Sequence, residues 1–351
     1  MLHEPLVEIR DLHLDMVTLD GVARVLNGVN LTIHRGDLLG IVGETGCGKS
    51  VTALSIPQLV PQPPARYPAG TVRFMGENVL EKSEEALREL RARHIGVIFQ
   101  DPMTGLNPVF TVEQQMVDAI LSRQGELEAT SLVRRWLPSS RAQRRGARER
   151  AVQLLRRVGI PEPEKRIHSY PHEFSGGMRQ RVLIAMAIAG RPDLLIADEP
   201  TTALDVSVQA QILRLIAELV AEIDLTVLLI THNIGVVAQF CTRVAVMYAG
   251  NVVETGPVRR ILRQPQHPYT RGLLQAIPTD DTARGALQGV PGSVPNLYQP
   301  PPGCRFAPRC DYVRAACHAA VPPLLETSPE HQVACVLYED DRGGIDAVHV
   351  M

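Results

Sequence analysis

The sequence lacks any apolar run long enough to cross a membrane, and it lacks an excess of charge of either sign. A membrane-spanning helix needs about 20 consecutive apolar residues, and no run in the 351 residues reaches that length. The N-terminal segment carries Glu4, Glu8 and Asp11 without a sustained apolar stretch, so we expect no signal peptide. The formal net charge is −2, which argues against a protein that seeks nucleic acid in general. We therefore expect a cytosolic protein that contacts a membrane only through a partner.

One short segment has the pattern G-x-x-x-x-G-K-[ST] and follows an apolar run over residues 38–42. Its residues are Gly43, Glu44, Thr45, Gly46, Cys47, Gly48, Lys49 and Ser50, followed by Val51. Glycines let the backbone turn so that successive N–H groups face phosphate oxygens, and the start of a helix adds positive potential. In such a loop Lys49 reaches the β- and γ-phosphates, and the Ser50 hydroxyl binds Mg²⁺. The alternative is a glycine-rich turn with a capping serine, but the preceding strand favours a nucleoside triphosphate site.

Two further segments follow this loop in a telling order. An S-G-G segment precedes a helical run over residues 182–189, and an apolar run over residues 194–197 ends in Asp198 and Glu199. Alone, S-G-G is a weak signal that usually marks the turn at the start of a helix. In this order the segments resemble the ATP-binding-cassette (ABC) family, whose LSGGQ signature is followed by the Walker B strand. Phe174 and Met178 stand where that signature has Leu and Gln.

The resemblance implies a role for the polar side chains at the ends of the strands. Asp198 would hold Mg²⁺ through water, with Ser50 and Gln100 as the other contributors. Glu199 would act as the general base that polarises the attacking water, since phosphoryl transfer needs an oriented nucleophile. Gln100 would also report the presence of nucleotide to a membrane partner.

Other positions are implied to act on a nucleotide shared between two subunits. The signature would contact the γ-phosphate of a nucleotide held by the opposite subunit, through Ser175, Gly176, Gly177 and Met178. Asp205 resembles the D-loop residue that crosses the dimer interface, and His232 resembles the switch histidine that hydrogen-bonds the γ-phosphate. Since the chain carries one loop and one signature, it must pair with itself or with a second ATPase. The signature variant with Phe174 and Met178 resembles that of peptide importers, which commonly use two different ATPases, so we expect a heterodimer.

Members of this family usually stack adenine on an aromatic side chain upstream of the phosphate loop. Met16 stands at that position here. A thioether can pack on a base through its polarisable sulfur, so we expect Met16 to contribute to ATP binding. Val22 or Arg24 could supply part of the contact.

The expected fold is an α/β P-loop NTPase, with a mostly parallel sheet core, an antiparallel β subdomain and an α-helical subdomain. The 351 residues exceed one ordinary domain. We expect an ATP-binding cassette over residues 1–262, with its helical subdomain at about residues 105–180, and a C-terminal extension over 263–351. An arginine-rich segment, residues 134–150, has two interpretations. It could contact anionic lipid headgroups, or it could be a solvated, partly disordered insertion.

The segments 267–274 and 291–310 resemble the extension that follows the cassette in oligopeptide and dipeptide importers. Four cysteines lie in this part of the chain: Cys304, Cys310, Cys317 and Cys335, with the spacing C-x5-C-x6-C-x17-C. A reducing cytosol disfavours disulfides, and four thiolates could hold zinc or a [4Fe–4S] cluster. The spacing lacks the close C-x2-C pairs of structural zinc sites, and the resemblance implies an iron–sulfur cluster; zinc and unliganded thiols are the alternatives. Because we expect the cassette to have its own core, we expect loss of a tail cysteine to leave ATP binding little changed.

Together the motifs predict the ATPase subunit of an ABC importer for di- or oligopeptides, using ATP and Mg²⁺. Its expected partners are two transmembrane permease subunits, a second ATPase subunit and, through the complex, an extracytoplasmic peptide-binding protein. We expect it at the cytoplasmic face of the membrane and expect no nucleic-acid partner. A related importer for nickel, sugars or other small solutes is the alternative. An ABC ATPase of DNA repair or translation would carry a long coiled-coil insertion or two cassettes, and the sequence has neither.

Overall fold

The computed structural model describes residues 4–101, 104–123, 141–202, 204–276 and 289–339. The chain divides into two compact units, of which the first combines residues 1–81 with residues 229–351 and the second consists of residues 82–228. The first unit is thus built from both ends of the sequence, and the second from its middle. Strand β9 (Thr226–Ile230) leads from the second unit into the first.

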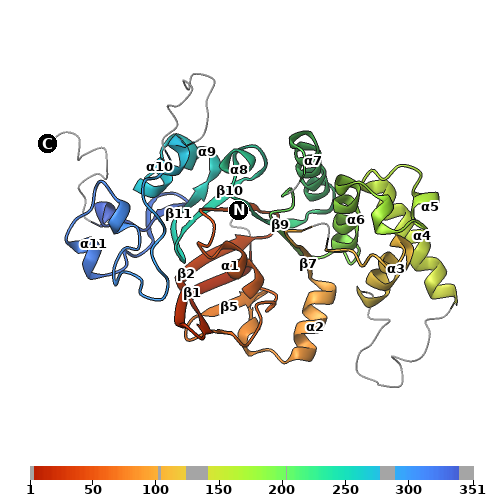
Figure 1. Ribbon diagram of the computed structural model, residues 1–351, viewed down its shortest axis with the longest axis horizontal. Coiled ribbons are helices and arrows are strands. Elements are labelled where there is room, and N and C mark those ends of the chain that lie inside the picture. The colour runs from red at the N-terminus through yellow and green to blue at the C-terminus, as the bar shows by residue number, and fades with distance from the viewer. Residues whose placement is uncertain (1–3, 102–103, 124–140, 203, 277–288, 340–351) are drawn as a thin grey trace. The chain divides into compact units, whose positions relative to one another are not determined.

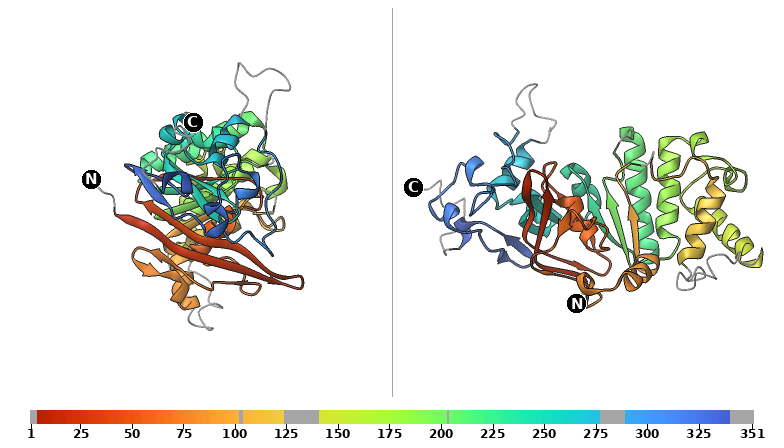
Figure 2. Two further views of the ribbon diagram at one scale, coloured as in Figure 1. Left: turned by 90° about the vertical axis from the view of Figure 1, so that its left-hand side faces the viewer. Right: turned by 60° about the horizontal axis from the view of Figure 1, so that its bottom comes forward.

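An antiparallel sheet forms the N-terminal part of the first unit. Its strands are β1 (Pro5–Thr18), β2 (Gly21–His34), β4 (Ala65–Arg66), β5 (Thr71–Phe74) and β6 (Glu77–Asn78). The order is β2-β1-β5-β6, with β4 also paired to β1. The long pair β1–β2 is drawn in red in Figure 2. Leu12, Leu14 and Leu26 are fully buried on one face, as expected for strands that alternate between a core and solvent.

A second sheet of the first unit carries the phosphate-loop strand. Its strands, in spatial order, are β12 (Leu325–Ser328), β13 (His331–Val333), β11 (Asn251–Pro257), β10 (Arg243–Tyr248) and β3 (Leu38–Val42). β10 pairs with β3 in parallel, and the other three pairings are antiparallel. Two strands of the C-terminal extension therefore continue the sheet of the cassette.

The helices of the first unit are α1 (Lys49–Ser55), α8 (Ile234–Phe240), α9 (Val258–Arg263), α10 (Pro268–Gln275) and α11 (Ala316–Ala319), with short 3₁₀ turns η1 (Val79–Glu81), η4 (Ala307–Arg309) and η5 (Val336–Tyr338). Helix α8 contacts β3, and α9 contacts β10 and β11. Figure 1 shows α8, α9 and α10 gathered beside β10 and β11. The Asn233 side chain accepts hydrogen bonds from the N–H groups of Gly235 and Val236, so it caps α8 where the chain leaves β9.

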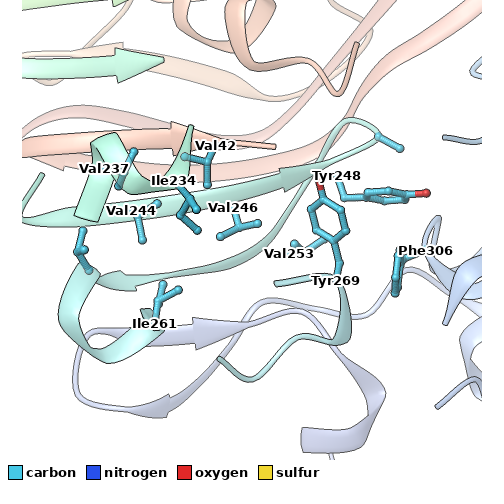
Figure 3. Close-up of a cluster of buried hydrophobic side chains, with 12 residues drawn as sticks. Val42, Ile234, Val237, Val244, Val246, Tyr248, Val253, Ile261, Tyr269 and Phe306 are labelled. Carbon is cyan, nitrogen blue, oxygen red and sulfur yellow. The ribbon is translucent and has the colours of Figure 1, made fainter. Parts of the chain in front are cut away.

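The extension shares its core with the cassette. One buried cluster contains Val42 of β3 and Val246 of β10 together with Tyr269 and Phe306 of the extension. Figure 3 shows these aromatic rings beside the sheet residues. The expectation of a cassette core independent of the extension is therefore wrong, because the aromatic side chains of the extension fill the space over β10 and β11.

The second unit combines two parallel strands with a group of helices. Its elements are α2 (Glu84–Arg93), β7 (Ile95–Ile98), α3 (Val112–Arg123), α4 (Arg141–Arg157), α5 (Pro163–Arg166), η3 (Pro171–Glu173), α6 (Gly176–Ile188), β8 (Leu194–Asp198) and α7 (Val206–Ile223). α6 lies between α7 and the pair α3–α4 (Figure 1). Helices α3 to α6 occupy the region in which the helical subdomain was expected.

The arginine-rich segment is described only in part, because residues 134–140 lie outside the described residues. Residues 141–150 belong to α4. There Arg145 pairs with Glu149 at 3.2 Å and Arg148 with Glu113 at 3.5 Å. These exposed ion pairs give two of the arginines acidic partners within the protein. Among the helices of the described residues, none has the length and apolar character of a transmembrane span.

Candidate functional site

The phosphate loop follows β3, which is buried at all five positions. Gly43 has a φ of +155°, and a Cβ atom there would lie 2.1 Å from the carbonyl oxygen of Met247. Gly48 has a φ of +98°, and a Cβ atom there would lie 2.8 Å from Leu26. The positive φ strains a side chain at both positions, and at Gly43 the backbone of Met247 also leaves no room for one. The glycines of the pattern are needed for the path of this loop, which a simple turn would not require at both ends.

Lys49 lies against the backbone of its own loop. Its ammonium donates to the carbonyl oxygen of Gly43 at 2.9 Å and to that of Glu44 at 3.0 Å, and the residue is only 6% exposed. Cys47 is also buried, and burial raises the pKa of its thiol, although the nearby Lys49 opposes the rise. Cys47 is therefore a neutral packing residue, and Lys49 brings the positive charge to the loop. Thr45 and Gly46 are exposed at the tip.

The extension contacts this loop at Glu44. The Glu44 N–H donates to the hydroxyl of Tyr269 at 3.0 Å. The guanidinium of Arg309 meets both carboxylate oxygens of Glu44, at 2.9 and 3.1 Å. Sequence reasoning missed both contacts. The Tyr269 and Arg309 segments were assigned to the extension, and no local pattern shows that they return to the loop.

Two other predicted residues lie in the first unit. His232 is exposed and directly follows Thr231, whose N–H donates to the carbonyl oxygen of Ile41 in β3 at 3.1 Å. It therefore stands close to the end of the strand that enters the loop. Met16 is half-buried in β1, opposite Ala23 of β2 and Ala65 of β4. The Tyr298 hydroxyl lies 3.1 Å from the hydroxyl of Thr18, the last residue of the same strand.

In the second unit, residues of two separate predicted motifs meet. Glu199 directly follows the buried Asp198 at the end of β8, and its backbone has a φ of +46°. One Glu199 carboxylate oxygen accepts hydrogen bonds from the Gln100 amide and from the Thr202 hydroxyl, both at 3.0 Å. A left-handed backbone is uncommon for a non-glycine residue and often occurs where function constrains the chain. The Gln100 and Glu199 side chains predicted to act on one water and Mg²⁺ are thus in direct contact.

The signature segment begins helix α6. The Ser175 hydroxyl accepts a hydrogen bond from the Met178 N–H at 3.3 Å, as an N-cap residue does. A Cβ atom at Gly177 would lie 2.7 Å from Val208 of α7, so a side chain there would clash with the neighbouring helix. The segment thus forms the turn at the start of a helix, as S-G-G segments usually do. Its action on a nucleotide of a second subunit stays a prediction. Asp205, also predicted to act between subunits, is exposed at the start of α7.

The four tail cysteines surround one small pocket. Cys304, Cys310, Cys317 and Cys335 all line it, and all four are free thiols. Burial raises the pKa of Cys310 to about 11 and that of Cys335 to about 12. Within the described residues, however, no group of three or more His, Cys, Asp or Glu side chains is arranged to hold a metal ion. The geometry therefore does not support the predicted [4Fe–4S] cluster, although its four donors gather in one place.

Comparison with known proteins finds relatives over most of the chain. A family model described as "ABC transporter" matches residues 26–202, and one described as "Oligopeptide/dipeptide transporter, C-terminal region" matches residues 253–317. A probable peptide ABC transporter ATP-binding protein of Sinorhizobium fredii is 48% identical over 94% of each chain. The oligopeptide transport ATP-binding protein OppD of Bacillus subtilis is 44% identical over 97% of this chain and 91% of its own.

A dipeptide transport ATP-binding protein and a solved structure extend the comparison. DppD of Bacillus subtilis is 43% identical over 97% of this chain and 96% of its own. Among solved structures, the ATP-binding cassette MJ0796, in a dimeric post-hydrolysis state with ADP and Pi, matches with a TM-score of 0.59 at 26% identity. That match covers 72% of this chain and 99% of the cassette.

Proposed function

The chain belongs to the ABC transporter family, and from that membership we propose that it is the ATP-hydrolysing subunit of an importer for di- or oligopeptides. The contact between Gln100 and Glu199 carries the hydrolytic part of the proposal, because it joins a predicted water-orienting base to a predicted Mg²⁺ contributor. The match of residues 253–317 to the peptide-transporter C-terminal region carries the substrate class. A related importer for nickel, sugars or other small solutes is the alternative.

In this proposal the loop from Gly43 to Ser50 binds the phosphates of ATP, and Lys49 moves from its backbone acceptors to the β- and γ-phosphates. Glu199 orients a water molecule for in-line attack on the γ-phosphorus and accepts its proton. The bond between the γ-phosphorus and the bridging oxygen breaks, and ADP leaves with that oxygen. His232 donates a hydrogen bond to the γ-phosphate. Met16 contributes to the adenine contact.

Mg²⁺ would be held by Ser50, Gln100 and, through water, Asp198. When bound, it supplies charge neutralisation at the β- and γ-phosphate oxygens. The donors fit this ion, because hydroxyl, amide and carboxylate oxygens are the ligands that Mg²⁺ prefers. Asp198, at the end of β8, would supply the carboxylate of this set.

We also propose that hydrolysis needs two subunits. The segment from Ser175 to Met178 would contact ATP held by the opposite subunit, and Asp205 would lie at that interface. A second ATPase subunit would complete the ATPase dimer. The closing of this dimer on ATP would drive two permease subunits in the membrane. An extracytoplasmic binding protein would deliver peptide. The protein would then associate with the cytoplasmic face of the membrane through the permeases.

The test of this function is transport by the complex rather than by the isolated chain. The chain is purified with the permeases that accompany it and reconstituted in vesicles with the binding protein. Radiolabelled di- and oligopeptides, Ni²⁺ and sugars are then offered with ATP inside or outside. Peptide uptake that needs ATP on the side of this chain supports the proposal. Uptake of Ni²⁺ or sugar alone overturns the peptide assignment, and absence of ATP hydrolysis overturns the ATPase assignment.

A [4Fe–4S] cluster in the extension stays a separate proposal. It rests only on the fact that Cys304, Cys310, Cys317 and Cys335 line one pocket, since four thiolates are the usual ligands of such a cluster; within the described residues the thiols are not arranged to hold a metal ion. Binding would have to remove protons from thiols whose pKa burial has raised. Anaerobically purified protein should then contain about four irons per chain. Zinc without iron would indicate the tetrahedral alternative, and neither metal would leave four reduced cysteines.

A further inference from the structure

We propose that Arg309 is a positioning residue of the nucleotide site, which holds Glu44 and thereby keeps the phosphate loop in the shape that binds ATP. The inference rests on the proposed function, because it concerns the same loop. It adds that the C-terminal extension sets nucleotide affinity, although the extension lies outside the segment that carries the loop.

The ion pair between Arg309 and Glu44 has the geometry of a strong contact. The two terminal nitrogens of the guanidinium lie 2.9 and 3.1 Å from the two carboxylate oxygens. Such forked pairs are more specific and stronger than single hydrogen bonds. The Arg309 side chain is only 5% exposed and that of Glu44 is 29% exposed. The pair is thus screened less by solvent than an ordinary surface salt bridge.

Arg309 is itself held in place by the extension and by the cassette. Its Nε donates to the carbonyl oxygen of Pro291 at 2.7 Å, and a terminal nitrogen donates to that of Val290 at 2.8 Å. The other terminal nitrogen donates to the Tyr248 hydroxyl at 3.2 Å. The guanidinium therefore has little freedom to follow Glu44 if the loop moves. It acts as a fixed point for the carboxylate.

The backbone of Glu44 makes a second contact with the extension. Its N–H donates to the hydroxyl of Tyr269, which is fully buried in the core of the first unit. The carbonyl oxygen of the same residue accepts a hydrogen bond from the Lys49 ammonium at 3.0 Å. A chain of contacts thus runs from the extension through Glu44 to Lys49. Loss of these contacts with the extension would free Glu44, whose carbonyl oxygen helps to position Lys49.

Charge leads to the same conclusion. The Glu44 carboxylate belongs to a loop that must accept the negative phosphates of ATP. A carboxylate there repels phosphate unless its charge is compensated, and Arg309 compensates it. Replacing Arg309 removes both the compensation and the fixed geometry. Replacing Glu44 with an uncharged amide removes the repulsion as well, so the two substitutions should not add.

The test compares single and double variants of the full-length protein in the binding of a non-hydrolysable ATP analogue with Mg²⁺, by calorimetry. We expect Arg309→Gln to weaken binding roughly 5- to 150-fold, the range of typical coupling between sites. Glu44→Gln combined with Arg309→Gln should bind several-fold more tightly than Arg309→Gln alone. In the assembled complex, the KM for ATP should rise by more than kcat falls. Arg314→Gln, at an exposed arginine of the same extension, is the matched control and should bind as the wild type does.

The outcomes separate this inference from the proposed function. Wild-type protein that does not bind the ATP analogue would refute the proposed function itself. If the wild type binds and Arg309→Gln binds equally well, only the role of Arg309 is refuted. Equal affinities of Arg309→Gln and the double variant would also overturn it, because an arginine that served only the stability of the fold, and did not act through Glu44, would give no rescue by removal of Glu44's charge. If Arg309→Gln does not fold, Arg309→Lys and Tyr269→Phe replace it, and unchanged affinity in both overturns the proposal.

Discussion

Replacement of Phe306 by alanine tests whether the extension and the cassette are one cooperative structure. Phe306 is 4% exposed. Its ring centroid lies 5.1 Å from that of Tyr248 in an edge-on arrangement and 5.5 Å from that of Tyr269. The same cluster includes Val42 of β3, the strand that leads into the phosphate loop. Truncation should therefore leave a cavity against the cassette sheet.

The expected cost follows from the burial of the ring. Phe→Ala substitutions in well-packed cores destabilise by about 3–5 kcal/mol. This is a large fraction of the roughly 5–15 kcal/mol that separates folded from unfolded domains. For a unit of this size each kcal/mol lowers the Tm by about 2–4 °C, so a fall of about 6–20 °C is expected. Because the cavity lies in the shared core, the Tm of the ATP-binding part should fall together with that of the extension.

Differential scanning calorimetry with and without Mg²⁺ and an ATP analogue measures this effect. Val313→Ala, at a side chain 43% exposed in the same extension, is the control and should change stability by less than about 0.5 kcal/mol. Two results would refute the reasoning. One is a fall in Tm of less than about 2 °C, which would mean that the ring contributes little. The other is a separate early transition of the extension, with the nucleotide-protected transition unchanged.

Further predictions concern hydrolysis, nucleotide binding and pH. Glu199→Gln should preserve ATP binding and lower the ATPase rate of the assembled complex by about 100-fold or more, as for loss of a positioned base; a loss below about tenfold would require another base. Lys49→Ala should weaken binding of the ATP analogue, because it removes the ammonium held at the loop, and unchanged affinity would contradict the assigned role. Burial lowers the pKa of His267 to about 4, although Glu254 opposes the shift. Between about pH 6.5 and pH 4, His267 therefore binds a proton in the unfolded chain but stays neutral in the folded protein. The stabilisation from neutral His267 is complete above about pH 6.5 and is lost towards about pH 4, which amounts to about 2 kcal/mol at pH 5. Denaturant titrations should show a weaker pH dependence for His267→Asn, which keeps a capping side chain at the start of α10, and an equal dependence would exclude His267 as its source.

The sequence alone predicted the cassette fold, and the comparisons confirm that fold class. It could do so because the phosphate loop is specified locally. Gly43 and Gly48 stand where a positive φ strains a side chain, and the apolar run before them is the buried strand β3. Ser175 was expected at a helix entry and caps α6. Such features depend on residues that are neighbours in the sequence, so a local sequence pattern is enough to predict them.

The sequence by itself thus determined which loop, strand ends and helix starts the protein would have. Only the tertiary structure decided which of them meet. Gln100 and Glu199 are 99 positions apart, and Glu44 and Arg309 are 265 positions apart. No local spacing encodes such pairs, because the packing of strands and of aromatic side chains between them brings the partners together. The same packing joins the extension to the cassette core, whereas the sequence predicted a cassette with a core of its own.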